Sequence, residues 1–224
     1  MVISYGQIIP KEFLELSENG FLNIHASILP KFRGAAPIQR AIMNQETETG
    51  ISFMKINENL DTGPIFKTYK IKIDLNLNAT ELEKKLSQLA AEKIIENIDN
   101  IIKGKAKLKE QDHSEATYAE KIIKTEGKIT WNDSSMKIIG KINGLHPNPG
   151  GDFIFNGDRY KILKAEIGNG SGHPGEVLND KLEIACSNNE SIKVIEIQKE
   201  GKKIQEINEF LNGSKIHKGC MLNE

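Results

Sequence analysis

The segment that decides the fold reads LNIHASILPKFRGAAPIQ and spans residues 22–39. Its first residues alternate apolar and polar side chains, a period of two that predicts a β-strand. On such a strand Asn23 and His25 share one face, ~7 Å apart along the chain. Pro30 lacks the N–H that a ladder needs, so the strand is expected to stop there. A carboxamide and an imidazole therefore project together near the carboxyl end of a strand, where open α/β sheets bind ligands.

The motif extends well beyond these two side chains. A His beside an Asn on a strand is by itself more often hydrogen-bonded structure than catalysis. Here, however, the pattern Asn23-x-His25-x-Ser27-x-Leu29-Pro30, followed by Arg33-Gly34, resembles the signature of folate-dependent formyltransferases. The extension GAAPIQRAI at 34–42 is similar to the methionyl-tRNA branch of that family. The family also carries an Asp within Leu-Asp-x-Gly, and residues 60–65 read LDTGPI, with Asp61 in that place.

The resemblance implies that Asn23, His25 and Asp61 are catalytic. Formyl transfer to an amine develops negative charge on the formyl oxygen, and two hydrogen-bond donors aimed at that oxygen stabilise the transition state. Asn23 and His25 are the expected donors. Asp61 is expected to orient His25, to favour its charged form and to accept, directly or through water, the proton that the attacking ammonium loses. Without the resemblance, the Asp-Thr-Gly stretch is explained as a simple turn.

The resemblance also implies a binding site for the formyl donor, 10-formyltetrahydrofolate, with no metal. The expected substrate-binding residues are Tyr5, Gly6, Gln7, Ile8, Ile9, Ser27, Ile28, Leu29, Pro30 and Arg33. The first five form a strand-to-loop turn that would line the pteridine pocket. Ser27 is equally well explained as a hydroxyl that fixes the end of the strand, and Arg33 is expected to meet the folate tail or tRNA phosphates.

Composition leaves the class of partner open. Lys and Arg number 30 against 31 Asp and Glu, so charge alone neither favours nor excludes a nucleic-acid partner. No apolar run approaches bilayer length and no signal peptide is visible, which predicts a soluble, cytoplasmic protein without a membrane partner. Cys186 and Cys220 lack metal-ligand spacing, which favours free thiols.

Alternating strands and helices in the first part of the chain predict a parallel α/β sheet. The expected strands are 1–10, 22–30, 50–56 and 66–73, and the expected helices are 11–19, 37–45 and 80–103. We interpret residues 1–104 as the C-terminal part of a Rossmann-like formyltransferase catalytic domain. The polar, aperiodic stretch that follows predicts a linker at 105–117.

Beyond the linker, short strands separated by turns predict a small barrel. Asn156-Gly157 is a strong hairpin signal, and Asp133 or Ser134 caps a helix. Residues 118–224 resemble the OB-like tRNA-binding domain of the methionyl-tRNA branch, through stretches such as ATYAEKI at 116–122 and PNPG at 147–150. Basic and acidic residues balance in this half, so a tRNA contact rests on the resemblance rather than on a basic field.

The resemblance begins at the strand before the catalytic one. About 80 residues that the family places earlier, roughly two or three strand–helix units, are therefore expected to be absent. A mis-set start, a split gene and a true shortened protein all explain this. On that expectation an unpaired sheet edge would leave the chain alone inactive and prone to self-association, unless a second chain supplies the missing part.

Three functions fit these observations. The first is formyl transfer from 10-formyltetrahydrofolate to the amino group of methionyl-initiator-tRNA, impaired if the front part is absent. The second is another folate-dependent formyltransferase that acts on a small amine or a sugar nucleotide. The third is a non-catalytic, tRNA-binding remnant.

Overall fold

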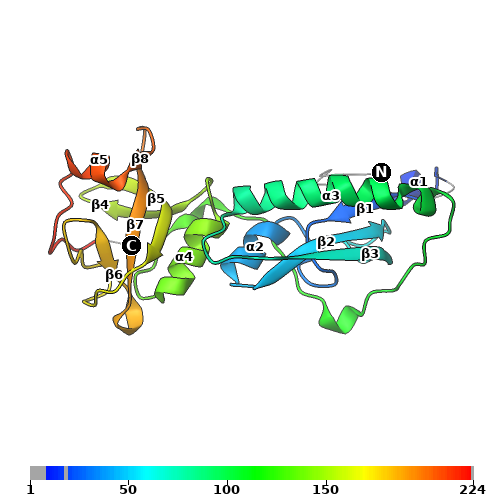
Figure 1. Ribbon diagram of the computed structural model, residues 1–224, viewed down its shortest axis with the longest axis horizontal. Helices are drawn as coiled ribbons and strands as arrows, with labels where there is room; N and C mark the ends of the chain where they lie inside the picture. The colour runs from blue at the N-terminus through cyan, green and yellow to red at the C-terminus, as the bar shows by residue number, and fades with distance from the viewer. Residues whose placement is uncertain (1–8, 18–19, 223–224) are drawn as a thin grey trace. The chain divides into compact units, whose positions relative to one another are not determined.

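The computed structural model describes residues 9–17 and 20–222, which form two compact units (Figure 1). The first unit contains the described residues up to Ala41, together with Glu46–Asp74 and Glu81–Lys121. The second contains Ile42–Gln45, Leu75–Thr80 and the described residues from Ile122 onward. None of the helices in the described part of the chain has both the length and the apolarity that crossing a bilayer requires.

The first unit is built on the sheet β1 (Leu22–His25), β2 (Glu48–Lys55) and β3 (Ile65–Lys72), in that spatial order. Both strand pairs are antiparallel, so the prediction of a parallel sheet is wrong for these strands. For β2 and β3 the reason is the loop 56–64, which contains no helix: a chain that turns straight back pairs antiparallel, whereas a parallel pair needs a long crossover. β1 also ends at His25, earlier than the expected stop at Pro30.

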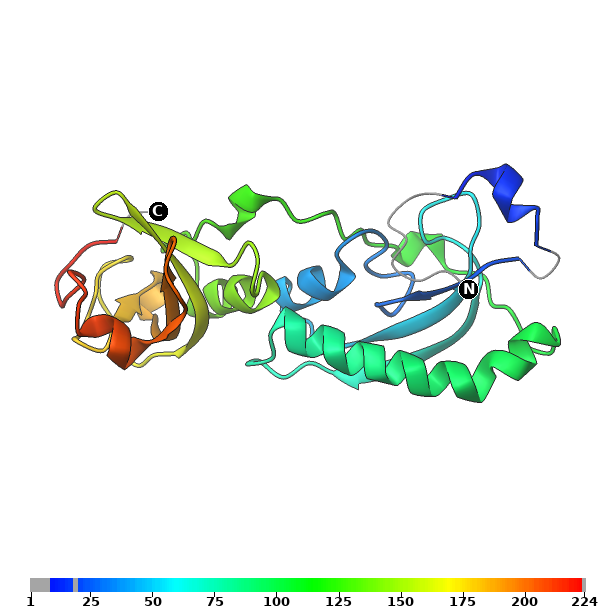
Figure 2. The same ribbon diagram turned by 90° about the horizontal axis from the view of Figure 1, so that it is seen from above.

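The helices of this unit agree with the sequence pattern except at the start. α1 (Lys11–Leu14) is a single turn rather than the predicted 11–19 helix. α2 (Pro37–Met43) and α3 (Ala79–Ile102) confirm their predictions. α3 lies along the three-stranded sheet, as Figures 1 and 2 both show. Of the expected strand at 1–10, residues 1–8 lie outside the described part of the chain.

The stretch predicted as a linker packs against the first unit instead. Lys109 exchanges two backbone hydrogen bonds with Ile65, of 2.9 and 2.8 Å, next to the start of β3. Further along, Tyr118 forms a parallel bridge with Arg33, and the Ala119 N–H donates to the Arg33 carbonyl at 2.7 Å. The sequence of this segment shows no periodic pattern of apolar residues. Its isolated bridges and its one 3-10 turn (His113–Glu115) do not recur at a fixed spacing.

The second unit is an antiparallel sheet of five strands. They are β4 (Gly151–Phe155), β5 (Asp158–Ile167), β6 (Glu183–Ala185), β7 (Ser191–Lys199) and β8 (Gln205–Glu206), in the order β4-β5-β7-β6 with β8 on β7. α4 (Ser135–Gly144) is capped by Ser134, and α5 (Ile207–Leu211) follows β8. Short 3-10 turns occupy Lys124–Gly127 and Ser187–Asn189.

The hairpin predicted at Asn156-Gly157 is confirmed, because the backbone there needs residues that tolerate positive φ. Asn156 and Gly157 both have positive φ, 51° and 82°, which is the conformation of a two-residue hairpin between β4 and β5. Residues 175–178 form isolated bridges rather than a strand, between Glu176 and Met221 and between Val177 and Ile184. The core holds an aromatic chain in which Phe153 contacts both Trp131 and Tyr160, with ring centroids 5.8 and 5.5 Å apart.

Glu183 is a buried carboxylate that stabilises this unit. Its oxygens accept hydrogen bonds from the Asn169 and Gly170 N–H groups at 2.8 and 2.7 Å, from Ser191 Oγ at 2.7 Å and from Asn179 Nδ2 at 2.8 Å. Burial raises the pKa of Glu183, but these hydrogen bonds outweigh burial and hold the pKa below its ordinary value.

Replacing Glu183 by Gln should therefore lower the free energy of unfolding by about 1–3 kcal/mol at neutral pH. Because the folded-state pKa is depressed, the advantage of the wild type is present above the unfolded pKa of about 4.3 and is lost as pH falls through the folded value. Urea unfolding followed by the fluorescence of Trp131, the single Trp of the chain, measures this unit. Exposed Glu166→Gln on β5 is the control, and equal losses for both variants at pH 7 would contradict the prediction.

Candidate active site

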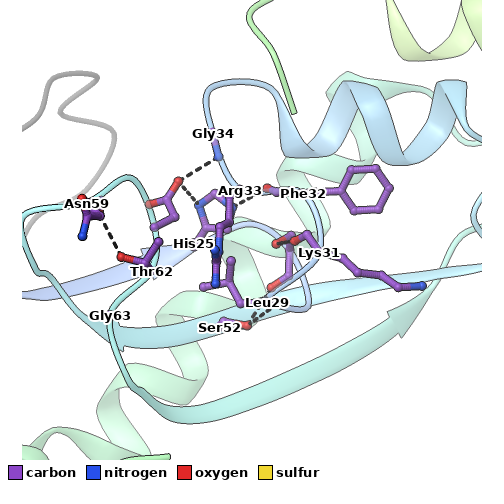
Figure 3. Close-up of polar contacts among 12 residues, drawn as sticks. His25, Leu29, Lys31, Phe32, Arg33, Gly34, Ser52, Asn59, Thr62 and Gly63 are labelled. Atoms are coloured by element: carbon purple, nitrogen blue, oxygen red, sulfur yellow. Dashed lines mark hydrogen bonds and ion pairs between the residues drawn. The ribbon is translucent and has the colours of Figure 1, made fainter. Parts of the chain in front are cut away.

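His25 lies at the end of β1 with its imidazole enclosed by the loop that follows. The residue is 6% exposed, and its Nε2 lies 2.8 Å from the Phe32 carbonyl oxygen. A carbonyl only accepts, so Nε2 carries a proton and donates it to this oxygen. Figure 3 shows His25 beside Phe32, Arg33 and Gly34, three consecutive residues that wrap around the ring. The other ring nitrogen, Nδ1, takes no part in this hydrogen bond and remains for a reaction.

Asp61 faces that nitrogen from the loop between β2 and β3. Its Oδ2 lies 3.6 Å from His25 Nδ1 and accepts a hydrogen bond from the Gly34 N–H at 2.9 Å. The separation of 3.6 Å exceeds a direct hydrogen bond, so the two loops, rather than a bond between the partners, hold the pair together. The pair becomes an ion pair when Nδ1 is protonated.

Asn23 stands two residues before His25 on the same strand and is half-buried. Its backbone pairs with Met54 of β2, while His25 pairs with Ser52. Among the described residues the Asn23 carboxamide has no hydrogen-bond partner. The structure thus brings His25 and Asp61 together and places Asn23 two residues before His25 on the same strand.

Ser27 has a structural contact of its own. It is fully buried, and its Oγ donates to the Lys31 carbonyl at 2.6 Å, which closes the turn after β1. The Ser52 hydroxyl donates to the Ser27 carbonyl at 2.8 Å and accepts from the Leu29 N–H at 3.1 Å. These contacts match the alternative that Ser27 fixes the strand end, and a direct contact with substrate stays a prediction.

The remaining predicted binding residues divide into three groups. Leu29 is 5% exposed and belongs to the core, and its N–H is already bonded to Ser52 Oγ. Ile9, Ile28 and Pro30 are half-buried. Tyr5, Gly6, Gln7 and Ile8 lie outside the described residues, and their predicted role stays a prediction.

The Arg33 side chain is buried and bound by polar neighbours, and its predicted contact with a folate tail or tRNA stays a prediction. The residue is 2% exposed, and its Nε and Nη2 donate to Gln111 Oε1 at 3.1 and 2.6 Å. Nη2 also donates to His113 Nδ1 at 3.0 Å. Sequence reasoning missed both partners because they lie in the aperiodic stretch, where a polar residue carries no signal of burial.

Two family models match this chain. The model described as "Formyl transferase" covers residues 1–98, and the model described as "Formyl transferase, C-terminal domain" covers residues 121–215. The methionyl-tRNA formyltransferase of Pelagibacter ubique is 63% identical over 222 residues, which are 99% of this chain and 72% of that protein. The chain belongs to the methionyl-tRNA formyltransferase family.

Other members of the methionyl-tRNA formyltransferase family match over the same span. The enzyme of Thermodesulfovibrio yellowstonii is 44% identical over 98% of this chain and 71% of its own length. Among solved structures, a methionyl-tRNA formyltransferase from Clostridium thermocellum is 25% identical, with a TM-score of 0.56 over 74% of this chain and 70% of that one. The sugar 3N-formyl transferase WlaRD, crystallised with dTDP and 5-N-formyl-THF, is 25% identical with a TM-score of 0.71 over 90% and 72%.

The surroundings of Asp61 are suited to a polar ligand. A cavity of about 560 Å³ opens beside the Asp61 loop and is lined by Asn57, Asn59, Leu60, Thr62, Glu110, His113 and Tyr118, with Arg33. Amide, hydroxyl and imidazole groups there offer hydrogen bonds, and Tyr118, 63% exposed, adds an aromatic face. No group of three or more His, Cys, Asp or Glu suited to a metal ion occurs among the described residues.

Proposed function

We propose that this chain transfers the formyl group of 10-formyltetrahydrofolate to the amino group of methionyl-initiator-tRNA, with Asn23, His25 and Asp61 as its catalytic residues. One observation carries the proposal. His25 Nδ1 and Asp61 Oδ2 face each other at 3.6 Å in a largely buried setting, with the carboxamide of Asn23 two residues away on the same strand. Membership of the methionyl-tRNA formyltransferase family supports the choice of substrates.

The proposed chemistry assigns each side chain one task. The amine attacks the formyl carbon, and the new C–N bond leaves an oxyanion that the Asn23 amide N–H and the His25 Nδ1–H stabilise. Asp61, held by the Gly34 N–H, takes the proton that the ammonium gives up, directly or through water. The bond from the formyl carbon to the folate nitrogen then breaks, and that nitrogen leaves with the proton that Asp61 took from the amine, returned directly or through water.

The finer fold assignment is part of the same proposal. The first unit would be part of a Rossmann-like domain, with β1 to β3 as the described portion of its sheet, and the second an OB-like domain that binds tRNA. The antiparallel order β4-β5-β7-β6, with β8 on β7, supports the latter. None of the findings supports a second chain, and that expectation stays a prediction of the sequence.

The substrate is the sharpest test of this proposal. Because the chain spans 72% of the Pelagibacter relative, activity is measured both in the 224-residue chain and in a chimaera. The chimaera adds to the chain those residues of the Pelagibacter protein that have no match in it. Each added residue keeps the position that it has in the Pelagibacter protein. With 10-formyltetrahydrofolate as donor, we expect formylation of methionyl-initiator-tRNA and none of free methionine or of a dTDP-linked amino sugar. A chimaera that formylates the amino sugar but not the tRNA would overturn the substrate assignment.

A further inference from the structure

Gln111 joins the two loops that carry the candidate site. The residue is 6% exposed, and its Nε2 donates to the Asp61 carbonyl at 2.9 Å and to the Gly63 carbonyl at 2.7 Å. Its Oε1 accepts from two nitrogens of Arg33, at 3.1 and 2.6 Å. Both amide hydrogens and both lone pairs of the carboxamide are therefore used.

These partners fix the amide in a single orientation. Backbone carbonyls can only accept and a guanidinium can only donate, so a flipped amide would place oxygen against oxygen and donor against donor. Arg33 is itself 2% exposed, so its guanidinium loses a buried hydrogen-bond acceptor if the amide leaves. Arg33 thus holds Gln111 with its two donors turned toward the Asp61 turn.

The turn that Gln111 holds is unfavourable for an isolated chain. Asp61 has φ +50°, in the left-handed region that residues other than glycine seldom adopt. At Gly63 a Cβ would collide with the Lys55 carbonyl, because the chain passes directly against β2. Such a backbone persists only where the surrounding contacts determine it. The hydrogen bonds from Gln111 to the carbonyls on both sides of Thr62 are contacts of that kind.

The same three-residue stretch, Phe32 to Gly34, reaches both members of the catalytic pair. The Phe32 carbonyl holds His25, the Gly34 N–H holds the Asp61 carboxylate, and the Arg33 side chain holds Gln111. Gln111 then fixes the Asp61 backbone. The position of Asp61 relative to His25 is thus defined through its side chain and, independently, through its main chain.

We propose that Gln111, held by Arg33, is a positioning residue that sets the Asp61 backbone and thereby the distance between the Asp61 carboxylate and His25 Nδ1. The inference rests on the proposed function, because His25 and Asp61, whose separation Gln111 sets, are the proposed catalytic pair. The proposal adds the segment that follows α3 in the sequence to the active site. This segment is a third component, together with the motif after β1 and the loop after β2.

A double-mutant cycle in the chimaera tests this role. Gln111→Leu should lower kcat by about 10- to 100-fold, since displacement of a catalytic group by as little as 1 Å has effects of this size, while KM for tRNA and for folate changes little. In the Asp61→Asn background the same substitution should change kcat far less, because no carboxylate remains to be positioned. Equal factors in the two backgrounds would overturn the proposal.

A spectroscopic measurement on the 224-residue chain does not depend on activity. The imidazole nitrogen resonances of His25, assigned with His25→Ala, should shift in Gln111→Leu and in Asp61→Asn. They should stay in place in Asn97→Ala, which removes a structural hydrogen bond to Tyr69 Oη in the same unit. If Gln111→Leu does not fold, Gln111→Asn retracts the amide by one methylene group and should give the same shift.

The two measurements separate this inference from the proposed function. His25 resonances that stay in place in a folded Gln111 variant would show a merely structural residue, whatever the chimaera does. A chimaera that fails to formylate tRNA contradicts the proposed function, and the spectra then decide the role of Gln111 by themselves.

Discussion

Replacement of His25 by Ala is expected to lower the kcat of the chimaera by about 100-fold or more, with KM for both substrates nearly unchanged. Asn23→Ala should have an effect of similar size. Both side chains are proposed to donate to the formyl oxygen, and a donor that acts on charge developed in the transition state contributes to kcat rather than to substrate binding. Steady-state formylation of methionyl-initiator-tRNA measures both parameters.

A matched His variant separates this effect from general damage to the protein. His173 is exposed in the second unit, and His173→Ala should keep the kcat of the parent chimaera. The unfolding midpoint of each variant shows whether the first unit remains folded, since His25 also donates to the Phe32 carbonyl. A folded His25→Ala or Asn23→Ala variant with nearly full kcat would remove that residue from the mechanism.

Asp61→Asn is expected to lower kcat by about 100-fold or more although the side chain keeps its shape. An amide oxygen can still accept from the Gly34 N–H, so the loop should stay in place. What is lost is the negative charge 3.6 Å from His25 Nδ1 and the ability to take up a proton. The pH–rate profile of the chimaera should therefore change shape as well as height.

The control for Asp61 is a second carboxylate in the same loop. Glu58 is exposed and contacts Lys11 at 3.1 Å, and Glu58→Gln should leave both kcat and the pH–rate profile as they are in the parent. A profile that Asp61→Asn lowers slightly without changing its shape would leave Asp61 as a loop residue with no part in proton transfer.

Sequence patterns predicted the local elements well where short-range chemistry determines them. Pro37 at the start of α2, the long amphipathic α3 and the Asn156-Gly157 hairpin all depend on residues within a few positions of one another. The relative direction of the strands in the first unit was predicted wrongly. The alternation of strands and helices suggested parallel pairs, whereas the helix-free loop between β2 and β3 returns the chain antiparallel.

The sequence by itself selected the side chains that are proposed to carry the chemistry. Asn23 and His25 are placed two residues apart by the period of a single strand, and the motif around Asp61 identifies its loop. Each of these signals is local, because a strand repeat and a turn are set by neighbours along the chain.

Only the tertiary structure decided how these groups are held. Arg33 and Gln111 are 78 positions apart, and neither lies in a repeating pattern that would reveal the contact. The burial of Arg33, the return of residues 109–119 past the Phe32–Gly34 stretch and the left-handed backbone of Asp61 all arise from such long-range contacts. A hydrogen bond between distant segments imposes no period on either one, so the partners of the proposed catalytic residues are seen only in the folded chain.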